Sequence, residues 1–231
     1  MTGPSGVVGA GRLRELVERN REARQHPDQR HEAEHEDEQE SERCDLCGEP
    51  VPGTHRHLLD LTLRELRCAC RACCVLFDHA SAGGTQYRLV PDRRLRLRDF
   101  SLDDVTWARL RIPVQVAFLV RDSGAERTVV FYPSPQGAVA APCDEDAWTF
   151  LERANPVLGR LASDVEALLV DRGGDAWLVP VDDCYALVGL LRTHWKGLTG
   201  GPDVREQITQ FFANLGERSK TVSATDDRNP A

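Results

Sequence analysis

Apolar and polar residues alternate along a short segment in the first half of the chain. Residues 57–62, with the sequence HLLDLT, place similar side chains at every second position, which is the period of a β-strand. Leu66–Cys68 can form the returning strand of a hairpin. Together with the later string YRLVP, this pattern predicts a small β module.

The second half of the chain contains two further hairpin patterns. The strings IPVQVAFLV and RTVVFYP are strand-like, and the segment DSGAE between them offers a glycine for the turn. Residues 138–141 can extend the same sheet. Residues 165–170 and 176–181 are also apolar, and DRGGD joins them. We therefore expect an antiparallel sheet.

Four segments carry apolar residues at helical spacing. The expected helices are residues 99–109 with Ser101 as cap, 144–154 with Ala147, Phe150 and Leu151 facing inward, 182–195 capped by Asp182 or Asp183, and 204–215. A further short helix is possible at residues 12–24.

These elements predict an α+β fold. We expect a disordered acidic tail at residues 1–43, a Cys-rich, zinc-ribbon-like β module at 44–92, an α+β domain at 93–216, and a disordered tail at 217–231. The whole chain has 231 residues, enough for such a module and a larger domain with its own core.

Charge and hydropathy narrow the function class. The formal net charge is -8, and residues 28–42 contribute most of it, which disfavours a nucleic-acid binder. The longest apolar runs, such as 114–120, are too short for a membrane-spanning helix, and the first residues do not resemble a signal peptide. We therefore expect a cytoplasmic protein, in which thiols stay reduced.

Six cysteines between residues 44 and 74 carry the strongest chemical signal. Two Cys-x-x-Cys pairs, Cys44 with Cys47 and Cys70 with Cys73, are separated by 22 residues, a spacing typical of a tetrahedral four-sulfur metal site. Gly48 can adopt the positive φ that the first turn needs, whereas the second pair lacks such a glycine. We interpret the ion as structural zinc.

The dense cysteine pattern leaves other ligand sets open. Cys68 and Cys74 could replace one of the four cysteines, and His57 could enter a mixed site. His55 and His79 are also near in sequence, so a second ion is possible, although we favour ordinary surface histidines. The same thiolates could instead hold a single iron, as in rubredoxin, or an iron–sulfur cluster.

Two cysteines lie outside this group. Cys143 and Cys184 each stand alone in the sequence, and Cys184 falls in the first turn of an expected helix, where a thiol pKa can be lowered. We favour simple burial for both, because no histidine follows at a convincing spacing. A thiol-dependent enzyme that uses Cys74 or Cys184 is therefore the weakest functional hypothesis.

Several strings together resemble an uncharacterised actinobacterial family whose members are encoded beside NiFe-hydrogenase genes. The resemblance spans residues 44–215 and rests on CDLCGEP, HRHLLDL, RCACRACCVLF, IPVQVAFLV, DDCYALVGLLR and WKGLTGGPDVREQITQFF. It implies an accessory protein that works with hydrogenase subunits or maturation factors, and it transfers no catalytic residue.

The sequence as a whole therefore predicts a metal-binding accessory protein that is not an enzyme. The first alternative is an iron–sulfur or rubredoxin-like electron carrier that serves a hydrogenase. In both cases we expect a protein partner, no membrane span and no nucleic acid.

Overall fold

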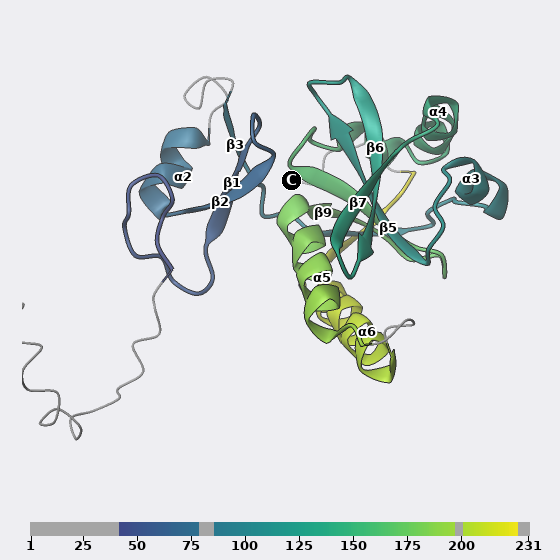
Figure 1. The fold of residues 1–231 in the computed structure, drawn as a ribbon. Coiled ribbons are helices and arrows are strands. Elements are labelled where there is room, and N and C mark those ends of the chain that lie inside the picture. Colours follow the sequence, from purple (N-terminus) through teal and green to yellow (C-terminus); the bar gives the residue numbers. More distant parts are fainter. Residues whose placement is uncertain (1–41, 79–85, 197–200, 226–231) are drawn as a thin grey trace, which may run out of the picture. The chain divides into compact units, whose positions relative to one another are not determined.

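The computed structural model describes residues 42–78, 86–196 and 201–225 (Figure 1). It contains two β-sheets with helices, so the expected mixed α+β fold with antiparallel sheets is confirmed. The acidic tail up to residue 41, with the helix expected at 12–24, lies outside the described residues. Among the described residues, no helix is both long and apolar enough to cross a bilayer.

The small sheet contains the predicted hairpin. It has the strand order β2-β1-β3, with β1 at Arg56–Asp60, β2 at Glu65–Ala69 and β3 at Tyr87–Leu89, and both pairings are antiparallel. Directly after β2, the chain forms the seven-residue helix α2 at Arg71–Phe77, which the sequence pattern did not predict.

The large sheet has seven strands in the order β10-β4-β9-β8-β5-β6-β7. All neighbours are antiparallel except β10 and β4, which are parallel. Both predicted hairpins are present, as β5–β6 and β8–β9. The strands are β4 (Leu95–Arg98), β5 (Val116–Asp122), β6 (Arg127–Ser134), β7 (Gly137–Pro142), β8 (Glu166–Asp171), β9 (Ala176–Pro180) and β10 (Lys220–Ser223).

Helices cover both faces of the large sheet. They are α3 (Asp104–Arg109), α4 (Glu145–Ala154), the 3-10 helix η1 (Pro156–Arg160), α5 (Val181–His194) and α6 (Gly201–Arg218). Successive residues of β5 enter opposite cores: Leu119 packs with residues of α3 and α4, whereas Phe118 packs with residues of α5 and α6. Because both faces are buried, the central strands are continuously apolar.

Three helix details differ from the sequence-based expectation. Helix α3 is capped by Asp103, which accepts a hydrogen bond from the Thr106 amide at 2.7 Å, and Ser101 is not the cap. Helix α5 begins earlier, after Pro180 and without a side-chain cap, so that Asp182 and Asp183 lie inside its first turn. In α4 the inward aromatic residue is Trp148, while Phe150 is 54% exposed.

The C-terminal segment also differs from the disordered tail expected from residue 217. Helix α6 extends to Arg218, and β10 then pairs with β4, which is more than 120 residues away in sequence. Ala224 is fully buried and Val222 packs against the core beneath α3 and α4. A short polar strand of this kind gains its order from a distant partner, so its own sequence carries little signal.

A buried carboxylate connects the small sheet to the large one. Asp164 is fully buried and accepts hydrogen bonds from Arg64 at 2.8 Å, in the β1–β2 turn, and from Arg88 at 2.7 Å, in β3. It also accepts hydrogen bonds from the amide and hydroxyl of Ser123, beyond β5. Arg64 makes a second ion pair with Asp122. One residue therefore joins three segments that lie far apart in sequence.

We predict that Asp164→Asn lowers the free energy of unfolding by about 2 kcal/mol, measured by urea denaturation. Asparagine tolerates the positive φ of 69° at this position but removes the negative charge that Arg64 and Arg88 share, and among the described residues only Arg64 keeps another carboxylate partner, Asp122. Because each of those arginines is 40% exposed, the cost stays below that of a fully buried unpaired charge.

The matched control is Asp175→Asn, which removes an exposed ion pair with Arg96. This control should cost less than about 1 kcal/mol. Equal losses in the two variants would contradict a special role for Asp164.

Candidate metal centre

The first cysteine pair lies on a tight turn that precedes the small sheet. The Cys44 amide donates to the Glu49 carbonyl at 2.8 Å, and the Gly48 amide donates to the Cys44 carbonyl at 2.8 Å. Gly48 has a φ of 77°, in the region that favours glycine, as the sequence predicted. The turn therefore holds Cys44 and Cys47 on one short loop.

The second pair lies at the start of α2, which explains why it needs no glycine. Cys70 is the N-cap of this helix, and its sulfur accepts a hydrogen bond from the Cys73 amide at 3.5 Å. The first helical turn then brings the Cys73 side chain to the same side as that of Cys70. A helix start thus replaces the second glycine-containing turn.

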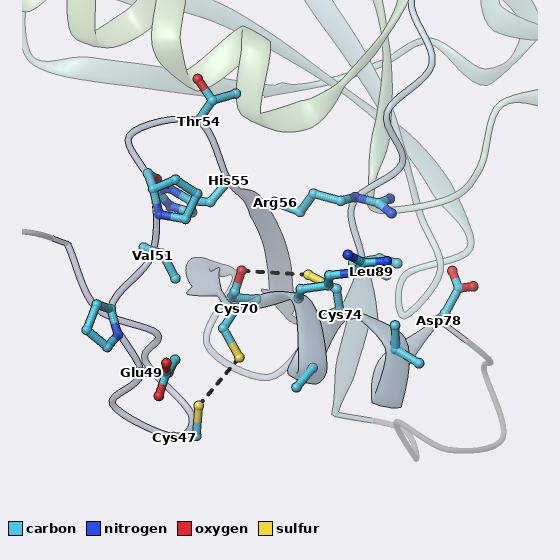
Figure 2. Close-up of a pocket in the computed structure, with 16 residues that line it drawn as sticks. Cys47, Glu49, Val51, Thr54, His55, Arg56, Cys70, Cys74, Asp78 and Leu89 are labelled. Atoms are coloured by element: carbon cyan, nitrogen blue, oxygen red, sulfur yellow. Dashed lines mark hydrogen bonds between the residues drawn. The ribbon is translucent and has the colours of Figure 1, made fainter.

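The four sulfurs converge. The sulfurs of Cys44, Cys47, Cys70 and Cys73 all lie within 4.8 Å of one another. The Cys47 and Cys70 sulfurs are 3.6 Å apart, and Figure 2 marks this contact with a dashed line. Sulfurs bound at about 2.3 Å to one tetrahedral ion lie about 3.8 Å apart, so little movement separates this arrangement from a metal site. All eight cysteines are free thiols.

The cluster is buried on one side and open on the other. Cys44, Cys70 and Cys73 are buried among a few apolar residues, whereas Cys47 is exposed. A hollow of about 810 Å³ adjoins the open side and is lined by Cys47, Cys70, Glu49, His55, Arg56 and Arg71 among others (Figure 2). Solvent or a partner can therefore reach the Cys47 sulfur.

Local hydrogen bonds make the four thiols unequal. Burial by itself would raise the pKa of Cys44, but bonds from the backbone of Cys70, Leu46 and Cys47 outweigh it and lower that pKa to about 6. Burial and the shared bonds with the neighbouring thiols raise the pKa of Cys73. The cluster therefore stabilises the thiolate of Cys44 near neutral pH. The thiolate is the form of cysteine that binds metal.

The alternative ligands are placed elsewhere. The Cys74 sulfur donates to the Ala69 carbonyl at 3.7 Å, and burial raises its pKa. Cys68 and His57 form a separate group with His55, outside the four-sulfur cluster. His79 lies outside the described residues. The structure thus brings together the four cysteines of the two Cys-x-x-Cys pairs and not their alternates.

Of the two isolated cysteines, Cys184 is buried and Cys143 is partly buried. Cys184 is fully buried in α5, and burial raises its pKa well above the ordinary value despite its position in the first helical turn. Burial also raises the pKa of Cys143 to about 12. Neither thiol is ionised at neutral pH, so neither provides an activated nucleophile.

Comparison with known proteins gives a family. No curated protein and no solved structure matches the chain. Residues 43–219 match a family of unknown function, DUF5947. This finding agrees with the expected uncharacterised family but carries no link to actinobacteria or to hydrogenase genes. Because the match covers well over half of the chain, this protein belongs to the DUF5947 family.

Proposed function

We propose that this protein binds one zinc ion through Cys44, Cys47, Cys70 and Cys73. The observation that carries the proposal is the convergence of four sulfurs from two segments that are 23 residues apart in sequence. Four thiolates around one ion form a closed tetrahedral site, which is the arrangement typical of structural zinc.

The small core of the module supports a structural role for the ion. Beside the cysteines, its buried apolar residues are Val51, Leu58 and Ala69, with Leu46, Phe77 and Leu89 packed around them. So few apolar side chains stabilise a fold only weakly, and metal binding supplies folding free energy to such modules.

We further propose that the protein acts as a non-enzymatic accessory protein, with hydrogenase subunits or maturation factors as candidate partners. The hydrogenase part rests on the sequence resemblance alone. The accessory role has some structural support, because Val75 and Leu76 of α2 are 68% and 58% exposed beside the cysteine cluster. Neighbouring exposed apolar side chains are common at protein interfaces.

Iron is the second candidate, and the exposure of Cys47 favours it. An electron carrier needs at least one ligand near the surface, since electron transfer requires close approach of the partner's redox centre. Cys47 meets this condition, while the other three ligands are buried. A single iron in a four-sulfur site, or an iron–sulfur cluster, would then make the protein a redox partner of an enzyme.

We predict that Cys70→Ser lowers the zinc content by one equivalent per chain, measured by elemental analysis of the purified protein. Serine keeps a good N-cap for α2 and removes only the thiolate. Cys143→Ser, which changes a thiol outside the cluster, is the matched control and should keep the full zinc content. A wild-type protein without stoichiometric zinc or iron would end the proposal.

The absorption spectrum separates zinc from iron. Zinc thiolates are colourless, whereas iron thiolates absorb strongly in the visible range. We expect protein purified without oxygen to show no visible charge-transfer bands. Bands that disappear in Cys70→Ser but persist in Cys143→Ser would instead show that the four sulfurs bind iron, as the electron-carrier alternative requires.

We also predict that Gly48→Ala weakens zinc binding about fivefold, measured by competition with a chelator. An added Cβ at Gly48 meets no atom within 4 Å, so the cost of about 1 kcal/mol comes only from the positive φ of the turn. Gly53→Ala has equally open space without a positive φ and should bind zinc like the wild type. Equal affinity in both variants would show that the turn does not preorganise the site.

A further inference from the structure

A second group of metal-ligating side chains lies beside the four-sulfur cluster. One ring nitrogen of His55, one ring nitrogen of His57 and the sulfur of Cys68 all lie within 4.8 Å of one another. The three residues are partly buried. Imidazole nitrogen and thiolate sulfur are both good ligands for zinc and its neighbours among the divalent transition ions.

Strand pairing explains why these three side chains meet. His57 on β1 lies directly opposite Cys68 on β2, so their side chains share one face of the small sheet. His55 precedes His57 by two residues, and the two rings have centroids 4.9 Å apart. His57 and Cys68 share their face of the sheet with Leu59, which packs into the core beneath α5 and α6. Leu58 lies on the opposite face and packs in the core around the four sulfurs.

Both histidines are oriented as metal ligands usually are. The Nδ1 atom of His57 lies 2.9 Å from a carboxylate oxygen of Asp182, whose other oxygen accepts a hydrogen bond from the Asp183 amide. The Nδ1 atom of His55 lies 2.9 Å from the Pro52 carbonyl. Each ring thus donates through Nδ1 to an oxygen, which leaves Nε2 with a lone pair for a metal ion.

One atom of this group lacks a partner. The His55 side chain is only 7% exposed, and its Nε2 is buried without a hydrogen-bond partner. Leaving such a nitrogen unpaired costs about 1–3 kcal/mol, so buried polar atoms normally have a hydrogen-bond partner, and an exception can mark the position of a bound ion. With Nδ1 already engaged, a metal ion at Nε2 removes this cost.

We propose that His55, His57 and Cys68 form a second metal site, for a divalent transition ion such as zinc. Three protein ligands leave the fourth tetrahedral position to water or an exogenous ligand, in contrast to the closed four-sulfur site. Asp182 acts as a positioning residue through His57. Because His57 belongs to the small sheet and Asp182 to α5, an ion bound here also strengthens the attachment of the small sheet to the large domain.

Titration with Co²⁺ tests the proposal. The full chain is first loaded with one equivalent of Zn²⁺ and then titrated with Co²⁺, whose visible ligand-field bands report tetrahedral coordination. We expect one further equivalent to bind, to produce such bands and to raise the thermal unfolding temperature. Each of these effects should be lost in His55→Phe and in Cys68→Ala.

The variants distinguish a ligand from a packing residue. His55→Phe keeps a bulky ring and removes the unpaired nitrogen, so its metal-free stability should equal or exceed that of the wild type. Cys68→Ala provides a second test if the phenylalanine disturbs the fold. His194→Ala, which removes a histidine at the distant end of α5, is the control and should leave Co²⁺ binding unchanged.

Asp182→Asn tests the positioning role. Loss of a carboxylate partner typically weakens metal binding 10–100-fold, so we expect a Co²⁺ affinity lower by about that factor. Asp203→Asn removes a carboxylate from the first turn of α6 and should have no effect. Failure of the zinc-loaded wild type to bind one equivalent of Co²⁺, or Co²⁺ binding by His55→Phe and Cys68→Ala equal to that of the wild type, would overturn the proposal.

Discussion

The convergence of four cysteine sulfurs on one point is the constraint on which the small sheet depends. The apolar core of this sheet is small. The turn at Gly48 and the start of α2 each bring two thiols to the same position. Burial alone would disfavour ionised sulfur here. Backbone amides around Cys44 reverse that tendency, so the polypeptide prepares the charge that a cation requires. The geometry, the burial and the electrostatics of the module therefore support the same chemistry.

Charged and polar contacts on the face away from the four sulfurs connect the small sheet to the large domain. Asp164 forms ion pairs with Arg64 and Arg88, and Asp182 forms a hydrogen bond with His57. Apolar packing of Leu59 and Val90 adds to these contacts. The contact between His57 and Asp182 holds the small sheet against the first turn of α5. An ion bound by His57 would therefore be coupled to the large domain through Asp182.

Regular elements were predicted well wherever local pattern and local contacts agree. The β5–β6 and β8–β9 hairpins have clear turn residues, and β1–β2 shows strand-like alternation between segments close in sequence, so all three could be recognised. Helix α2 was missed because its residues, RACCVLF, suggest ligands more than a helix, and its cap is a cysteine sulfur. Strand β10 was missed because its order comes from β4, far away in the sequence. The first turn of α5 was misread because the helix starts directly after Pro180, and Asp182 and Asp183 inside that turn pair with His57 and Arg94 instead of acting as the N-cap.

The sequence by itself determined which residues are chemically able to bind metal, because thiol spacing and the glycine after Cys47 are local properties. It also determined the mixed α+β class through the periods of its apolar residues. Only the tertiary structure decided how the six clustered cysteines and their neighbouring histidines are divided. Strand register places Cys68 with His55 and His57, helix α2 points Cys74 away, and a carboxylate 125 residues distant orients His57. Such choices depend on which faces of paired elements meet, and spacing along the chain carries no information about that.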